Sequence, residues 1–153
     1  MNEQQGYDVE DLSVGMSACY GKTVTDADIV LFAGVSGDNN AVHTNQEFAA
    51  TTIFGGRIAH GMLSASLISA AVGTRLPGAG AVYLGQTLHF RAPVRPGDTV
   101  NTTVIVKSVD LNRARVVLET VCRVGTTVVV DGEANVMVTS SARRMAKANT
   151  SAS

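Results

Sequence analysis

An acid and a base lie five positions apart in the segment Val35-Ser36-Gly37-Asp38-Asn39-Asn40-Ala41-Val42-His43. On a helix this spacing corresponds to about 500°, so that Asp38 and His43 would point to different sides. On a strand an odd spacing places two residues on opposite faces. The glycine and the two asparagines of the segment tolerate turn and left-handed backbone conformations. We therefore expect an irregular backbone that lets Asp38 and His43 face one site.

A converging carboxylate and imidazole form a general acid–base pair. The carboxylate of Asp38 can fix the tautomer of His43, or the two groups can hold one water molecule between them. Asn40 can donate a hydrogen bond that orients either partner. The alternative is purely structural, with Asp38 as a turn residue that ends a helix and His43 as a residue of a surface loop.

A second group of interest is His60-Gly61-Met62-Leu63, which begins a long apolar segment. A glycine in the first turn of a helix has a backbone N–H that points outward beside the positive end of the helix dipole. Such an N–H can stabilise a carbonyl oxygen that gains negative charge. We expect His60 to start the helix and to hydrogen-bond the preceding loop. Together with the acid–base pair, this donor suits chemistry next to a thioester carbonyl.

The remaining pattern indicates the elements that position these residues. Thr25 is a helix N-cap followed by acidic residues, and Gly34 and Gly37 end that helix. We predict a short helix at residues 45–51, a loop at 52–59 and a helix, apolar nearly all round and therefore buried on most sides, from Gly61 to just before Pro77.

Strands precede and follow these helices. One short strand is expected within residues 12–24, and strands with β-branched residues and short turns follow at 81–90, 98–109, 113–124 and 126–138. The order predicts an α+β fold in which a curved antiparallel sheet wraps the long helix. We expect one domain at residues 12–138, with loose termini at 1–11 and 139–153.

Composition narrows the classes of function. The 153 residues carry a net charge of −1, which lacks the basic field of a nucleic-acid binder. The low-charge stretch at residues 62–72 is too short for the roughly 20 residues that cross a bilayer. The chain is 45% hydrophobic and only 16% charged, which favours a partner subunit over part of the surface.

Cysteine and histidine spacing points to neither a redox centre nor a metal site. Cys19 and Cys122 form no CxxC pair and are interpreted as small buried residues, which fits a reducing cytoplasm. The three histidines lack the spacing of metal ligands, so no metal is expected.

Two motif blocks resemble a known family. The pattern Ser36-Gly37-Asp38-x-Asn40-x-x-His43 with Ala49, followed by Ile58-x-His60-Gly61-Met62-Leu63, is similar to the hydratase 2 motif of the MaoC-like (R)-specific enoyl-CoA hydratases. Residues 83–86 and 93–98 also resemble short bacterial members used in polyhydroxyalkanoate supply. The resemblance covers residues 12–138. The family usually has proline where this chain has Ala41, which removes a rigid residue but no chemical group.

The resemblance implies the hot-dog fold and the addition of water across the C2–C3 double bond of a trans-2-enoyl-CoA, which gives an (R)-3-hydroxyacyl-CoA. It implies that Asp38 and His43 activate the water, that either one returns a proton to C2, and that the Gly61 N–H holds the thioester oxygen.

The resemblance also implies substrate-binding residues and an assembly. Asn40 would support the acid–base pair, Ser69 would line the acyl pocket, and Val72 would set its depth; plain core packing is the alternative for Ser69 and Val72. It implies a homodimer, and no cofactor apart from the CoA that belongs to the acyl-CoA substrate.

Two other functions stay open from the sequence. A hot-dog thioesterase would aim a water at C1 rather than C3, and a non-catalytic acyl-thioester binding subunit would keep the pocket without the acid–base pair. Four cations could bind the phosphates of CoA or could be ordinary surface charges: Lys22, Arg57, Arg91 and Arg95.

Overall fold

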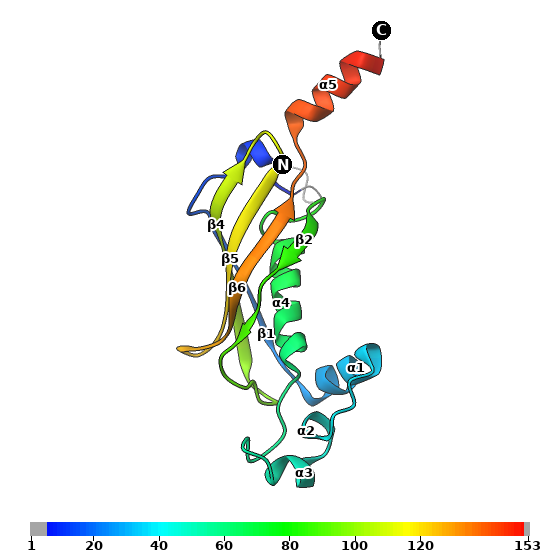
Figure 1. The fold of residues 1–153 in the computed structure, drawn as a ribbon, viewed down its shortest axis with the longest axis vertical. Coiled ribbons are helices and arrows are strands. Elements are labelled where there is room, and N and C mark those ends of the chain that lie inside the picture. Colours follow the sequence, from blue (N-terminus) through cyan, green and yellow to red (C-terminus); the bar gives the residue numbers. More distant parts are fainter. Residues whose placement is uncertain (1–5, 152–153) are drawn as a thin grey trace.

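A computed structural model describes residues 6–151, and in it a six-stranded antiparallel sheet wraps one long helix (Figure 1). The strand order is β1-β4-β5-β6-β2, and β3 also pairs with β6. This arrangement confirms the α+β class. The strands are β1 (Ser17–Thr23), β2 (Val82–Gln86), β3 (His89–Phe90), β4 (Thr99–Asp110), β5 (Arg115–Val124) and β6 (Thr127–Met137).

The three longest strands follow one another as hairpins. In the β4–β5 turn, the Asp110 carboxylate accepts a hydrogen bond of 3.0 Å from the backbone N–H of Arg113. In the β5–β6 turn, Gly125 has a φ of 56°, a left-handed conformation that glycine adopts without strain. Short turns of this kind make neighbours in sequence neighbours in the sheet.

The long helix α4 (Gly61–Thr74) lies in the curve of the sheet. Leu67, Ile68 and Val72 are buried on it and pack in the same core as Val104 and Leu118 of the sheet. Full burial of such a side chain contributes about 1.5–3 kcal/mol, so this contact is what holds the helix in the sheet. The opposite face of α4, which includes Met62, Ser66 and Ser69, is exposed in the single chain. The prediction that this helix is buried on most sides is therefore wrong for the face that carries these three residues.

Three short helices form the end of the molecule below the sheet in Figure 1. They are α1 (Asp26–Ser36), α2 (Ala41–Thr44) and α3 (Gln46–Ala50). Thr25 caps α1, as its sequence predicts, and it does so in a reciprocal capping box with Asp28. The helix passes through Gly34 and ends at Gly37, whose φ of 77° is left-handed.

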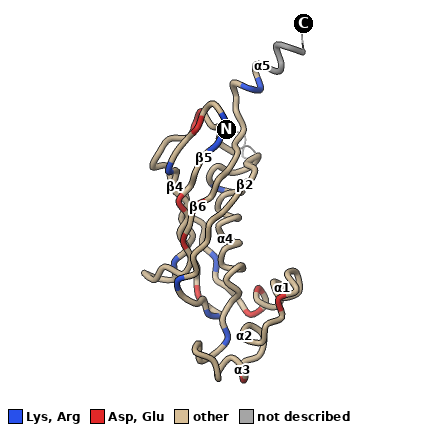
Figure 2. The backbone as a smooth tube through the Cα atoms, in the orientation of Figure 1, with Lys and Arg blue, Asp and Glu red and all other residues tan. Residues whose placement is uncertain are grey.

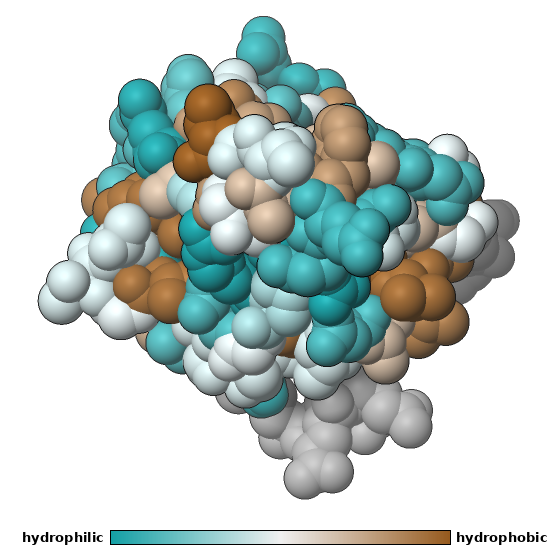
Figure 3. Space-filling model, turned by 90° about the horizontal axis from the view of Figure 1, so that it is seen from below, coloured by the Kyte–Doolittle hydropathy of each residue, from teal (hydrophilic) through white to brown (hydrophobic). Residues whose placement is uncertain are grey.

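Apolar side chains are exposed at this end. Seen from below, they form separate patches between polar residues (Figure 3). Exposed apolar side chains on α1, α3 and the loop after α3 are Val30, Leu31, Val35, Phe48 and Ile53. The apolar composition of the chain is thus reflected in its surface as well as in its core.

The strand predicted over residues 81–90 is divided into β2 and β3. The division lies at Thr87, which crosses Gly132 of β6 so closely that a Cβ on Gly132 would be 1.8 Å from the Thr87 carbonyl oxygen. Thr87 still hydrogen-bonds Glu133 through its N–H and through its hydroxyl, at 3.0 and 2.9 Å. A close backbone approach of this kind interrupts the regular ladder.

The termini are more ordered than expected. Val9 is completely buried, and the Asp8 carboxylate forms an ion pair with Arg144. Residues 9–11 form a short 3-10 helix, and residues 141–151 form helix α5 (Ser141–Ser151), where the sequence predicts a loose tail. The expectation of loose termini is therefore corrected for residues 6–11 and 141–151, while residues 1–5 and 152–153 lie outside the described residues.

Charges are distributed over the sheet and the outer helices, whereas α4 has none (Figure 2). Within residues 6–151, no helix combines the length and the apolar character that a membrane crossing requires. Cys122 is buried, as expected, but Cys19 on the edge strand β1 is exposed.

Candidate active site

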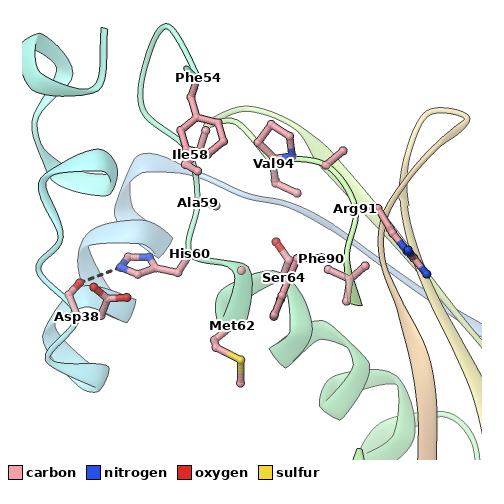
Figure 4. Close-up of a pocket in the computed structure, with 14 residues that line it drawn as sticks. Asp38, Phe54, Ile58, Ala59, His60, Met62, Ser64, Phe90, Arg91 and Val94 are labelled. Atoms are coloured by element: carbon pink, nitrogen blue, oxygen red, sulfur yellow. Dashed lines mark hydrogen bonds between the residues drawn. The ribbon is translucent and has the colours of Figure 1, made fainter. Parts of the chain in front are cut away.

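A pocket with a volume of about 470 Å³ opens where α4 begins, between the loop that precedes this helix and the segment Phe90–Val94 (Figure 4). Its walls are mainly apolar, with Asp38 and His60 on one side and Arg91 on the other. The lining residues are Asp38, Phe54, Ile58, Ala59, His60, Gly61, Met62, Ser64, Phe90, Arg91, Ala92, Pro93, Val94 and Val130. An apolar pocket with a few convergent polar groups is the usual form of a small-molecule site.

The structure brings Asp38 and His43 together beside this pocket. The distance from Asp38 Oδ2 to His43 Nε2 is 4.0 Å. The Asp38 side chain is half-exposed, whereas His43 is buried. This distance is too long for a direct hydrogen bond, and one water molecule can bridge it.

The tautomer of His43 follows from its second nitrogen. Nδ1 lies 2.8 Å from the carbonyl oxygen of Ile58. A carbonyl oxygen can only accept, so Nδ1 carries the proton and donates it. In the neutral ring, Nε2 then has a lone pair that faces the Asp38 carboxylate. This is the arrangement that a general base requires.

Asn40 positions both members of the pair. Its backbone N–H donates to Asp38 Oδ1 at 3.2 Å. Its side-chain oxygen accepts from the N–H of Val42 at 3.2 Å and so caps α2, the single turn that carries His43. Asn40 thus supports the acid–base pair through bonds to its near neighbours in the chain. Its side chain caps α2, and its backbone N–H binds Asp38.

His60 connects the acid–base loop to the start of α4. Its Nε2 donates to the backbone oxygen of Asp38 at 2.9 Å (Figure 4). Its ring stacks on His43, with ring centroids 3.9 Å apart, and Phe32 lies on it at 5.0 Å. The expectation that His60 starts the helix and bonds the loop is confirmed.

Gly61 is the first residue of α4 and lines the pocket. Its N–H has no intrahelical acceptor because it belongs to the first turn. A side chain at this position would collide with Phe90, since a Cβ would be 2.8 Å from Phe90 Cε1. The glycine thus allows Phe90 to pack directly on the start of the helix.

The ligand atoms of Asp38, His43 and His60 lie within 4.8 Å of one another, a grouping that could hold a cation. Two features of the geometry oppose this use. The His60 nitrogen nearest Asp38 already donates to a carbonyl, and the two imidazoles stack instead of pointing at one centre. The absence of a metal remains a prediction.

Ser69 and Val72 do not reach this pocket. Eight and eleven residues along the helix from Gly61 correspond to about 12 and 16 Å at the usual rise per residue. Ser69 is exposed and Val72 is in the core. Their predicted contacts with the acyl chain therefore stay predictions, and Ser69 meets the chain only if the chain passes along the exposed face of α4.

The four candidate cations for CoA phosphates are already engaged. Lys22 pairs with Asp28, Arg57 with Asp26 and Arg91 with Asp131. Arg95 donates to the carbonyl oxygen of Phe54 at 2.5 Å and so holds the loop at the rim of the pocket.

Several lining residues were not singled out from the sequence. Phe54 and Val94 lie on segments with no periodic pattern that could place them, and Phe90 is the last residue of the strand predicted over residues 81–90. Ser64 had a usable signal, because it is three positions after Gly61 and therefore on the same side of the helix.

The fold and the site together place the chain among the hot-dog proteins. Its structure matches that of the unliganded R-hydratase PhaJ1 from Pseudomonas aeruginosa with a TM-score of 0.84 and 46% identity, over 89% of this chain and 88% of that one. The family model "MaoC like domain" matches residues 14–131. The chain belongs to the MaoC-like family.

Named relatives agree with this assignment. The chain is 54% identical to an (R)-specific enoyl-CoA hydratase of Rhodospirillum rubrum, over 84% of this chain and 90% of the relative. It is 53% identical to a 3-hydroxybutyryl-CoA dehydratase of Methylorubrum extorquens, over 84% and 82%. Both relatives are hydro-lyases by name.

Proposed function

We propose that this protein is an (R)-specific enoyl-CoA hydratase, which adds water across the C2–C3 double bond of a trans-2-enoyl-CoA. The observation that carries the proposal is the 4.0 Å separation of Asp38 Oδ2 and His43 Nε2 at an apolar pocket that also contains the start of α4. An acid–base pair and an N–H donor beside one apolar cavity are the groups that hydration of an unsaturated thioester requires.

The reaction uses a water held between the two side chains. The water donates one hydrogen bond to Asp38 and one to His43 Nε2. His43 takes a proton as one O–H bond breaks, and the oxygen forms its bond to C3. The π electrons of the double bond move toward the thioester oxygen, giving an enolate-like state. A proton then reaches C2 from His43 or through Asp38, and the product is the 3-hydroxyacyl thioester.

The Gly61 N–H stabilises the charge on the thioester oxygen. The N–H stands at the positive end of α4, and the walls around it are mainly apolar. A hydrogen bond to a developing negative charge is stronger in such a low-dielectric site than in water. This donor acts on C1, while the acid–base pair acts on C2 and C3.

The test compares the wild-type protein with Asp38→Asn on crotonyl-CoA. We expect loss of the conjugated thioester absorbance with the wild type, an (R)-3-hydroxybutyryl product by chiral analysis, and a rate lower by about 10²–10⁴-fold in the variant. Asp110→Asn, in the distant β4–β5 turn, is the matched control. Release of free CoA without a hydroxyacyl product would instead indicate a thioesterase, and silence on all enoyl thioesters would indicate a binding subunit.

Crotonyl-CoA is the first substrate to test because one relative is named for the four-carbon 3-hydroxybutyryl-CoA. Longer enoyl-CoAs and the acyl-carrier-protein thioesters follow in the same assay. The proposed reaction uses no cofactor, since CoA enters as part of the substrate. We expect full activity after treatment with a chelator and gel filtration; a loss restored by a divalent cation would contradict this. We also place the protein in the cytoplasm, where CoA thioesters are used.

We further propose a homodimer. The end strand β2 has a free edge, and exposed apolar residues continue from it to the start of α4: Val82, Leu84, Phe90 and Met62. A free strand edge beside apolar side chains is a template for pairing with a second chain. Light scattering should give twice the mass of the chain. Leu84→Glu should lower it, whereas Leu111→Glu, in the exposed β4–β5 turn, should not.

A further inference from the structure

Ser64 is a buried serine whose hydroxyl is free. It lies in the first turns of α4, is 2% exposed and lines the pocket. Within residues 6–151 its hydroxyl has no hydrogen-bond partner, and Figure 4 shows it pointing into the space between α4 and the Phe90–Val94 segment. Among the described residues the one buried side-chain N or O atom without a partner is His60 Nδ1, so the Ser64 hydroxyl is open to the pocket. A molecule in the pocket can therefore form a hydrogen bond with it.

Two other hydroxyls on α4 behave differently. Ser66 donates to the carbonyl oxygen of Leu63 at 2.6 Å, and Thr74 donates to that of Ala70 at 2.7 Å. Both bond back to the preceding turn, which is the usual solution for a serine or threonine in a helix. Ser64 lies on the same helix and does not use this solution, so its hydroxyl is available to a molecule in the pocket.

The position of Ser64 on α4 determines which atom of a bound substrate its hydroxyl can reach. It is three residues after Gly61, and side chains on a helix lean toward the N-terminus, so its oxygen lies over the turn that begins with Gly61. The polar group that the proposed reaction places at Gly61 is the thioester oxygen. The acyl chain beyond it has no polar atom, and the water of the reaction is held at Asp38 and His43.

We propose that the Ser64 hydroxyl donates a second hydrogen bond to the thioester oxygen and acts with the Gly61 N–H on the enolate-like state. The inference rests on the proposed function, because it assigns a donor to that reaction. Two donors on one oxygen polarise the carbonyl more than one, and the second donor gains strength as negative charge develops. Ser64 is thus a catalytic residue, whereas Asn40 and His60 position others.

The kinetic test uses Ser64→Ala, which removes one oxygen atom and introduces a better helix former. We expect the melting temperature to be retained, kcat on crotonyl-CoA to fall by roughly 10²-fold and KM to change little, since loss of one such donor typically costs about 10²–10³ in kcat. Ser66→Ala, on the exposed face of the same helix, is the matched control and should keep the wild-type kcat.

A second measurement observes the carbonyl directly. Crotonyl-CoA labelled with ¹³C at the thioester carbonyl is bound to Asp38→Asn, which turns over slowly, and its infrared C=O band is recorded. We expect this band to move to higher frequency when Ser64→Ala is added to Asp38→Asn. A change in packing alone would not move it in this direction.

The outcomes separate the two proposals. An active wild type with an unchanged kcat in Ser64→Ala, a higher KM alone, or a C=O band that does not move would overturn the role of Ser64 and leave the hydratase assignment standing. A wild type that hydrates none of the enoyl thioesters would overturn both. A lower kcat together with a shifted band would support the second donor.

Discussion

The imidazole rings of His43 and His60 stack with their centroids 3.9 Å apart and an angle of 31° between their planes. One ring belongs to the acid–base pair, and the other belongs to the residue that directly precedes α4 and the Gly61 donor. Because His60 also holds the backbone oxygen of Asp38, a single side chain fixes the position of the acid–base loop relative to the start of the helix. The two parts of the site are therefore coupled through His60.

This coupling predicts the effect of His60→Phe. The ring stack is kept, but the bond to the Asp38 carbonyl is lost, so kcat should fall about fivefold, as expected for roughly 1 kcal/mol of positioning. The melting temperature should not fall, because His60 Nδ1 is a buried atom without a partner among the described residues and phenylalanine removes it. Phe32→Leu, on the other side of the ring, is the control for packing. An unchanged kcat in His60→Phe would refute the coupling.

Gly61→Ala tests the close contact with Phe90. The new Cβ would lie 2.8 and 2.9 Å from two ring carbons, so the ring must move, and its exposure allows this without unfolding. We expect kcat/KM on crotonyl-CoA to fall by about 10²-fold, because a displacement near 1 Å at a reacting group has that effect.

Two further variants show whether the collision with Phe90 causes the loss of kcat/KM in Gly61→Ala. Gly73→Ala, where a Cβ meets nothing within 4 Å, should keep full activity and raise the stability by about 0.5–1 kcal/mol. Phe90→Ala added to Gly61→Ala should restore part of the activity if the collision is the cause. Equal loss in the single and double variants would show that the collision is not the cause.

The sequence predicted the elements that local pattern decides. Thr25 and Asp28 form the expected cap, and the turn at Gly125 joins the expected strands, because both depend on residues that are close in the chain. The spacing of Asp38 and His43 also predicted correctly that the backbone around them is irregular, since α1 ends at Ser36 and α2 begins only at Ala41.

The features that the sequence did not predict depend on distant contacts. The strand over residues 81–90 is divided by a close approach to Gly132, and α5 begins where Glu10 accepts its first N–H groups, about 130 positions earlier in the chain. The single turn that carries His43 is too short for any periodicity to show. The free hydroxyl of Ser64 depends on how α4 packs against the Phe90–Val94 segment.

Asn40 should act on catalysis through the helix that it caps. Replacing it with alanine removes the acceptor for the N–H of Val42, and loss of such a cap typically costs about 1 kcal/mol. We expect a kcat lower by about tenfold in Asn40→Ala and near the wild-type value in Asn40→Ser, which can still cap. Chemical denaturation provides the stability of each variant. A low kcat in both variants would indicate that the amide contacts the substrate directly.

Glu10 provides a test by pH at the other end of the molecule. Its carboxylate accepts hydrogen bonds from the Ser140 hydroxyl and from the backbone N–H groups of Ser141 and Ala142 at the start of α5. The Ser140 hydroxyl is the largest cause of the lowered pKa of Glu10, and desolvation opposes it. The backbone N–H groups of Glu10, Ser141 and Ala142 add to the lowering, and the pKa falls from 4.5 to about 2. The charged form is the one that α5 binds.

The lowered pKa of Glu10 predicts how the stability of the protein depends on pH. A carboxyl group whose pKa is lowered by folding makes its full contribution to stability above pH 4.5. This contribution is lost as the pH falls toward 2. The difference in melting temperature between the wild type and Glu10→Gln should therefore be constant from pH 7 to 5 and shrink steadily below 4.5. Glu47→Gln, at the exposed start of α3, is the control and should follow the wild type throughout. A difference that stays constant down to pH 3 would show that Glu10 does not hold α5 through its charge.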